Sequence, residues 1–155
     1  MTDGWLDFWR DAELDEHKHV QGYLWVRSGV YGGPGGFWTR EKGQKFVRMR
    51  PGTYTMEHST LSQYPDVKCL RPVGLSDPKQ AACLIHPITD HVNVKYRDSA
   101  EVLAGCIAPF LMWLPEAPGS SKAAMEMLWK WLGGYAKGKQ VSLRIINDVP
   151  ASAQG

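Results

Sequence analysis

Cysteine is scarce in this chain, which argues against a disulfide-stabilised protein and against a zinc protein with paired cysteines. The 155 residues include only three cysteines, an odd number whose spacing matches no paired zinc-binding pattern. We therefore expect reduced thiols rather than a disulfide framework. His17 and His19 have no evident third partner in the sequence, so we expect no metal site and no cofactor.

Long apolar runs are also missing. No apolar stretch approaches the roughly 18 residues that a membrane helix needs, so we expect no membrane span. The first residues have no basic stretch followed by an apolar core, which argues against a signal peptide. We expect the protein to be cytoplasmic as synthesised, and to leave the cell only by lysis or in an assembled virion.

Charge of one sign is not in excess. The chain has 18 Lys and Arg against 16 Asp and Glu, and a formal net charge of +2. Affinity for nucleic acid depends on neutralising phosphates, so this balance argues against nucleic acid as a partner. Arginines on a strand next to aromatic residues could still form a local basic patch.

Glycine, proline and tryptophan are plentiful, with 16, 10 and seven residues respectively. A chain that turns so often cannot consist mainly of long helices. We expect a mainly β fold of the α+β class. It would be a small β-barrel or β-sandwich-like sheet with one C-terminal amphipathic helix and a final strand.

Apolar and alternating segments predict a series of short strands, at 23–28, 46–50, 53–57, 67–70, 82–86, 92–96 and 141–145. No internal repeat or change in composition divides the chain. We expect a β-rich core at 46–147 and a flexible tail at 148–155. Residues 1–45 would belong to the same domain and add a short helix, a strand and a glycine-rich loop.

Two helices are predicted. Ser120 or Ser121 can cap the start of the first, and Gly133-Gly134 end it, with Trp129 on its apolar face and Trp131 nearly opposite. The second is a short amphipathic helix that includes Trp5, Phe8, Trp9 and Ala12. The segment 31–37, rich in glycine and with one proline, is expected to be a loop.

The segment from Cys83 to Pro109 carries the residues best suited to chemistry. His86 ends an apolar run, and Gly105-Cys106-Ile107 follows downstream. A histidine can take the thiol proton and hold the reactive thiolate at neutral pH. Gly105 would let a substrate carbonyl approach and would leave backbone donors for an oxyanion. Alternatively, His86 and Cys106 lie among apolar residues because both are core residues.

Three short segments carry a resemblance to a known family: Pro51-Gly52-Thr53-Tyr54, Leu84-Ile85-His86 and Gly105-Cys106-Ile107. Over about residues 46–147 the chain resembles the phage and bacterial family called domain of unknown function 5675. The helix and strand expected between Ser120 and Ile145 fit that pattern. The resemblance implies a phage or prophage context and no established activity.

A weaker resemblance is to the L,D-transpeptidases, which join an Ile-His strand to a Ser-His-Gly-Cys-Ile-Arg motif. Gly105, Cys106 and Ile107 match that motif, and His86 matches its first histidine. Leu103-Ala104 stand in place of Ser-His, and Ala108 stands in place of the arginine. The resemblance implies Cys106 as the nucleophile and His86, or less directly His91, as the base, acting on a cell-wall peptide amide.

Other residues leave further functions open. Arg71 and Arg97 could clamp a carboxylate, because a guanidinium makes bidentate hydrogen bonds. The leading hypothesis is a cysteine-dependent acyl hydrolase or transferase. The alternatives are a non-enzymatic phage protein that packs against copies of itself or other virion proteins, and a small-ligand-binding phage factor whose pocket uses the glycine-rich loop.

Overall fold

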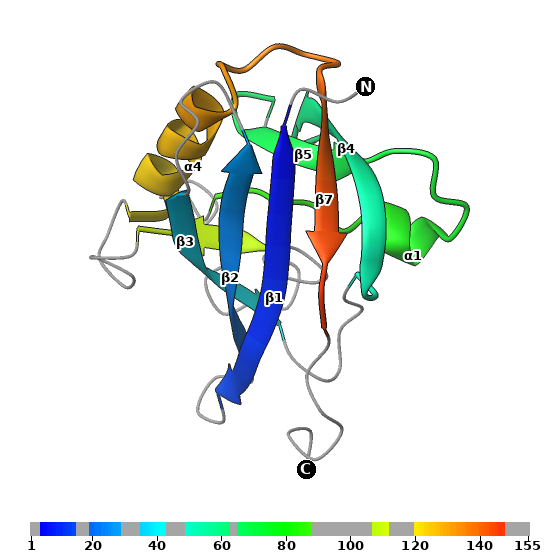
Figure 1. Ribbon diagram of the computed structural model, residues 1–155. Coiled ribbons are helices and arrows are strands. Elements are labelled where there is room, and N and C mark those ends of the chain that lie inside the picture. Colours follow the sequence, from blue (N-terminus) through cyan, green and yellow to red (C-terminus); the bar gives the residue numbers. More distant parts are fainter. Residues whose placement is uncertain are drawn as a thin grey trace.

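The computed structural model describes residues 4–14, 19–28, 35–42, 49–62, 65–87, 107–111 and 120–147 (Figure 1). Over these residues the chain is mostly β, as predicted. The strands are β1 (Trp5–Leu14), β2 (His19–Ser28), β3 (Gly35–Lys42), β4 (Gly52–Thr60), β5 (Lys68–Pro72), β6 (Ala108–Phe110) and β7 (Gln140–Ile145). The helices are α1 (Pro78–Ala81) and α4 (Ser120–Trp131), and neither is long and apolar enough to span a bilayer.

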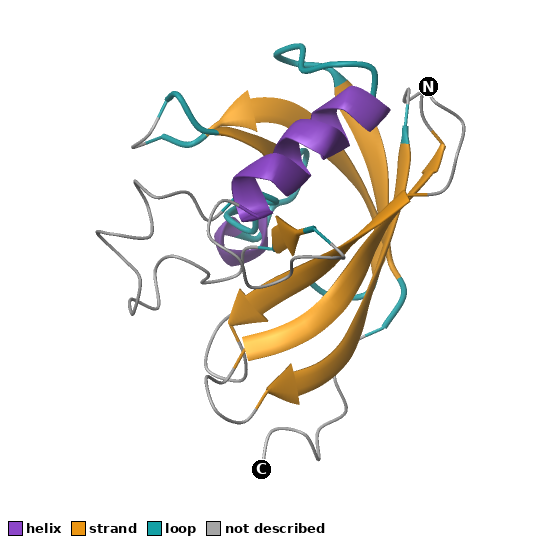
Figure 2. Ribbon diagram, turned by 90° about the vertical axis from the view of Figure 1, so that its left-hand side faces the viewer, coloured by secondary structure: helices purple, strands orange, loops and turns teal. Residues whose placement is uncertain are grey.

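All seven strands belong to one curled sheet in the order β5-β4-β7-β1-β2-β3-β6. Neighbouring strands are antiparallel except β1 and β7, which are parallel. The sheet bends into a half-barrel, and α4 lies diagonally across its concave side (Figure 2). The N-terminal strands β1–β3 therefore share a sheet with the strands that follow Met49.

Ile85 links the two edges of this half-barrel. It forms an antiparallel bridge with Leu70 of β5 and a parallel bridge with Ile107, the residue before β6. The bridge to Leu70 has hydrogen bonds of 2.9 and 3.0 Å between backbone N and O atoms. Because β5 and β6 are the edge strands, these bridges satisfy backbone groups that an open edge would leave exposed.

The core fills the concave side. Alternate residues of each central strand point inward, among them Leu6 and Phe8 of β1 and Leu143 of β7, all fully buried. They pack against Leu128 and Trp129 of α4. Burying one side chain of this size is worth about 1.5–3 kcal/mol, so the helix and the sheet stabilise each other.

The predicted C-terminal helix is confirmed as α4. It ends before Gly133 and Gly134, which have φ of 90° and 96°. These values favour glycine because other side chains rarely adopt them. The Ser120 hydroxyl accepts a hydrogen bond of 3.0 Å from Leu111 N and so ties the helix start to the end of β6. Trp131 does not stand away from the core, because its ring packs 5.0 Å from that of Phe37.

The predicted N-terminal helix is wrong, because residues 5–12 lie in β1. Trp5, Phe8 and Trp9 fit a helical spacing, but inward and outward residues in fact alternate along the segment. The predicted loop at 31–37 is also wrong in its last part, because β3 begins at Gly35. Glycine in β3 makes room for large rings from neighbouring elements.

The other strand predictions differ in outcome. Those at 23–28, 53–57, 67–70 and 141–145 correspond to β2, β4, β5 and β7. The prediction at 82–86 is too long: Ala82 caps α1, and only Ile85 forms bridges. Residues 49 and 50 are not in a strand. Segments 46–48, 92–96 and 148–155 lie outside the described residues.

Candidate functional site

His86 follows Ile85, at the point where Leu84–His86 meet the chain that leads into β6. Its backbone N donates to Ile107 O at 3.1 Å, and Ile107 N donates to Leu84 O at 2.8 Å. These two hydrogen bonds hold Leu84–His86 parallel to the start of β6. Ile107 is the residue covalently bonded to Cys106.

The His86 ring is buried and oriented by a carbonyl group. Its Nδ1 lies 2.8 Å from the backbone oxygen of Pro87. A carbonyl oxygen only accepts, so Nδ1 carries the proton of the neutral ring and donates it. The basic lone pair is then on Nε2. This is the tautomer that a histidine needs to accept a proton through Nε2.

The other predicted site residues have different outcomes. Cys106, His91, Gly105 and Arg97 lie outside the described residues. Arg71 is on β5, where its Nη2 donates to Thr60 O at 3.0 Å. Its Nε lies 3.5 Å from the Ser59 hydroxyl oxygen. These described contacts of Arg71 are within the β4–β5 hairpin, so they support that hairpin.

A second buried histidine, His58, lies in an aromatic cluster on the inner side of β4. Its ring centroid is 4.8 Å from that of Trp129 and 5.7 Å from that of Tyr135. Ala136 N donates to its Nδ1 at 3.2 Å. Burial, and secondarily the positive charge of Lys139, lower the pKa of His58 to about 4. The ring is therefore neutral at physiological pH and serves as a hydrogen-bond acceptor.

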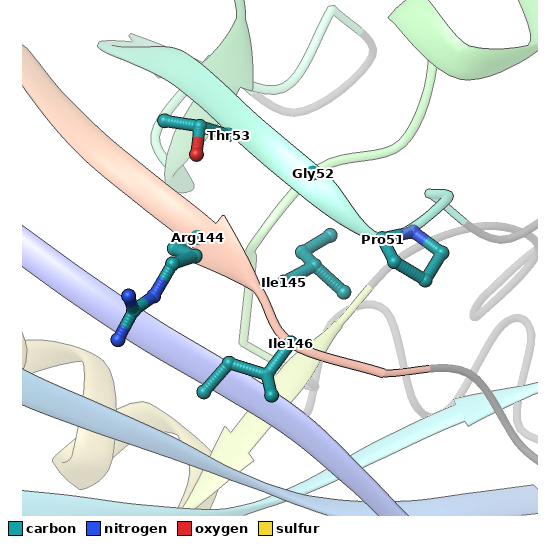
Figure 3. Close-up of a pocket in the computed structure, with 6 residues that line it drawn as sticks. All are labelled: Pro51, Gly52, Thr53, Arg144, Ile145 and Ile146. Atoms are coloured by element: carbon teal, nitrogen blue, oxygen red, sulfur yellow. The ribbon is translucent and has the colours of Figure 1, made fainter.

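An open pocket of about 540 Å³ lies where β4 begins and β7 ends, lined by Pro51, Gly52, Thr53, Arg144, Ile145 and Ile146. Figure 3 shows Arg144 and Ile146 extending to one side of β7 and Ile145 to the other. The lining holds one cation and no histidine, cysteine or carboxylate. It can contribute binding, but its lining residues offer no cysteine nucleophile and no histidine base for acyl transfer.

Two charged clusters were not predicted from the sequence. Arg10 and Glu41 form an ion pair of 2.8 Å, and both side chains are buried. Asp7, also buried, accepts hydrogen bonds from Arg27, Arg144 and Trp5. No alternating pattern in 5–11 reveals the strand or the Asp7 cluster, because the aromatic residues at positions 5, 8 and 9 follow a helical spacing.

Neither a search for metal-binding clusters nor a comparison with known proteins points to a function. Among the described residues, no group of three or more His, Cys, Asp and Glu side chains could hold a metal ion. Cys69 and Cys83 are buried, and Cys83 Sγ lies 3.4 Å from Lys79 O. No protein-family model, curated protein or solved structure matches the chain.

Proposed function

We propose that this protein is a cysteine-dependent acyl hydrolase or transferase of phage or prophage type that acts on a peptide amide, such as one in cell-wall peptide. Cys106 is the nucleophile and His86 is the general base. The supporting observation is the pairing of Leu84–His86 with Ile107, the residue bonded to Cys106. The oriented tautomer of His86 adds to it. The phage context and an association with virions rest on the motif resemblance alone.

In the proposed reaction, His86 Nε2 takes the proton of the Cys106 thiol. The thiolate sulfur attacks the amide carbonyl carbon, and backbone donors at Gly105 stabilise the oxyanion. The imidazolium returns the proton to the leaving nitrogen as the C–N bond breaks. The remaining thioester is cleaved by water in a hydrolase, or by an amine in a transferase.

The proposal predicts how fast each cysteine reacts with iodoacetamide. Alkylation would be followed by mass spectrometry across about pH 5 to 9. An ordinary cysteine titrates near 8.5, whereas a thiol paired with histidine reacts well below pH 7. We expect only Cys106 to react rapidly at about pH 6, with buried Cys69 and Cys83 as internal controls. His86→Gln should move the titration of Cys106 back toward that of an ordinary thiol.

The enzymatic step is tested with cell-wall peptides. We expect a thioester adduct on the tryptic peptide that contains Cys106, and no turnover by Cys106→Ser. Turnover by Cys106→Ser would exclude Cys106 as the nucleophile. If Cys106 reacts no faster than Cys69 and Cys83 until the protein unfolds, the acyl-transfer proposal fails. The non-enzymatic phage protein would then be the better hypothesis, and its assembly state the next measurement.

A further inference from the structure

A row of aromatic rings crosses the outer face of the sheet, the side opposite α4. Trp9 of β1 pairs with Tyr23 of β2, which pairs with Trp38 of β3. The ring centroids are 5.8 and 4.4 Å apart, with interplanar angles of 35° and 38°. All three side chains are partly exposed. No described helix or strand covers this face, which is toward the viewer in Figure 1.

Two arginines are fixed beside this row by one buried carboxylate. Arg144 Nε and Nη2 each lie 3.1 Å from an oxygen of Asp7. Arg27 Nε donates to Asp7 at 2.8 Å. The Asp7 side chain is 1% exposed, whereas those of Arg27 and Arg144 are 54% and 48% exposed. Each guanidinium therefore has a defined position and still reaches solvent.

The charges of this cluster do not cancel. Two guanidiniums share one carboxylate, so the cluster carries one net positive charge. Arg40 adds a cation next to Trp38 in β3, and Asp11 adds an anion near Tyr23. Among the described residues, the outer face of β1, β2, β3 and β7 thus places three cations and two anions beside partly exposed rings.

We propose that this outer face binds single-stranded nucleic acid. Bases would stack on Trp9, Tyr23 and Trp38, since every base has a flat face that an aromatic ring can cover. Phosphates would accept hydrogen bonds from Arg27 and Arg144, whose planar guanidiniums suit phosphate oxygens. A neutral glycan would make no use of the fixed cations. A second copy of the chain would bring the same excess charge against itself.

Affinity and its salt dependence test this proposal in the full-length protein. The probe is a fluorescein-labelled oligothymidine of about 12 nucleotides, within the range that such surfaces cover. With two phosphate contacts, log affinity should fall with log salt with a slope of about −1.4. Arg27→Gln and Arg144→Gln should each make that slope shallower by about 0.7.

Loss of a stacking ring should weaken binding at every salt concentration. Trp9→Ala and Trp38→Ala should each lower affinity by about 5- to 150-fold. Trp9→Phe keeps a ring and should retain most of the affinity, which separates stacking from misfolding. Lys130→Gln is the matched control, because Lys130 is exposed on α4 at the other side of the sheet and should leave affinity unchanged.

Three outcomes overturn the proposal. The first is the absence of oligothymidine binding at about 50 mM salt. The second is binding that the aromatic and arginine variants leave unchanged. The third is binding of another partner to this face. That partner would be a soluble glycan if a glycan binds without salt dependence. It would be a second copy of the chain if sedimentation shows a dimer that Trp9→Ala dissociates while oligothymidine does not bind.

Discussion

The guanidinium of Arg10 on β1 reaches across β2 to the carboxylate of Glu41 on β3. Arg10 Nε and Nη2 lie 2.8 and 3.0 Å from the two carboxylate oxygens. Nη2 also donates to Met49 O at 2.7 Å. Gly22 occupies the position opposite Arg10 on β2, where a Cβ would meet Trp9 O and Thr39 Oγ1. The pair is therefore a buried, bidentate ion pair inside the sheet.

Breaking this pair should be costly. Glu41→Gln leaves the Arg10 charge buried without its counterion, and we expect the free energy of unfolding to fall by about 3–5 kcal/mol in urea denaturation. Glu126→Gln on the exposed side of α4 is the control and should change it by less than about 0.5 kcal/mol. The double variant Arg10→Met with Glu41→Leu should be more stable than Glu41→Gln. A loss no larger than that of the control would contradict the buried pair.

Gly36 should tolerate no side chain. It lies opposite Trp25 in the β2–β3 pairing, and a Cβ at Gly36 would collide with the Trp25 ring. We expect Gly36→Ala to lower the free energy of unfolding by about 1–3 kcal/mol. Combining it with Trp25→Leu should recover part of that loss, which a double-mutant cycle would measure. Strictly additive losses would argue against the contact.

The local sequence was enough to predict some elements. In α4 the apolar residues recur at helical spacing, and two glycines end the helix, so nearby residues specify both its face and its end. In β7 the alternation of buried Val141, Leu143 and Ile145 marks one face of a strand. These signals do not depend on distant partners, and they led to the correct fold class.

Other elements depend on contacts that are distant in sequence. The segment 5–12 fits both a helix and a strand, and pairing with β2 and β7 decides between them. Asp7 can be buried in that strand only because Arg27 and Arg144 reach it from other strands. Gly35 lies in a strand because it pairs with Val26 of β2, and the Trp131 ring occupies the space that a side chain at Gly35 would need.

The candidate site likewise depends in part on local sequence and in part on contacts that are distant in sequence. A motif pointed to His86 and Cys106, but neither segment alone specifies that Leu84–His86 pairs with Ile107. That pairing depends on Ile85 lying between Leu70 and Ile107, which closes the sheet.

We expect Ile85→Ala to lower the free energy of unfolding by about 2–5 kcal/mol, because Ile85 is fully buried. Urea denaturation checks this, and a loss below about 1 kcal/mol would show that Ile85 is not tightly packed.

Acid should destabilise the fold through His58. Its pKa of about 4 in the folded protein lies below the ordinary value of 6.5, so the unfolded chain binds a proton more readily. The contribution of His58 to stability is complete above about pH 6.5 and is lost as pH falls toward 4. The loss approaches about 3 kcal/mol, at about 1.4 kcal/mol per pH unit.

Urea denaturation at several pH values, compared with His58→Asn, isolates this effect. The substituted side chain carries an amide oxygen that can replace Nδ1 as the acceptor for Ala136 N, and it does not titrate. We expect the stability of the native protein to fall more steeply than that of the variant between about pH 6.5 and 4. Parallel pH profiles would show that His58 keeps an ordinary pKa in the folded protein, and so that its ring reaches water despite its position between Trp129 and Tyr135.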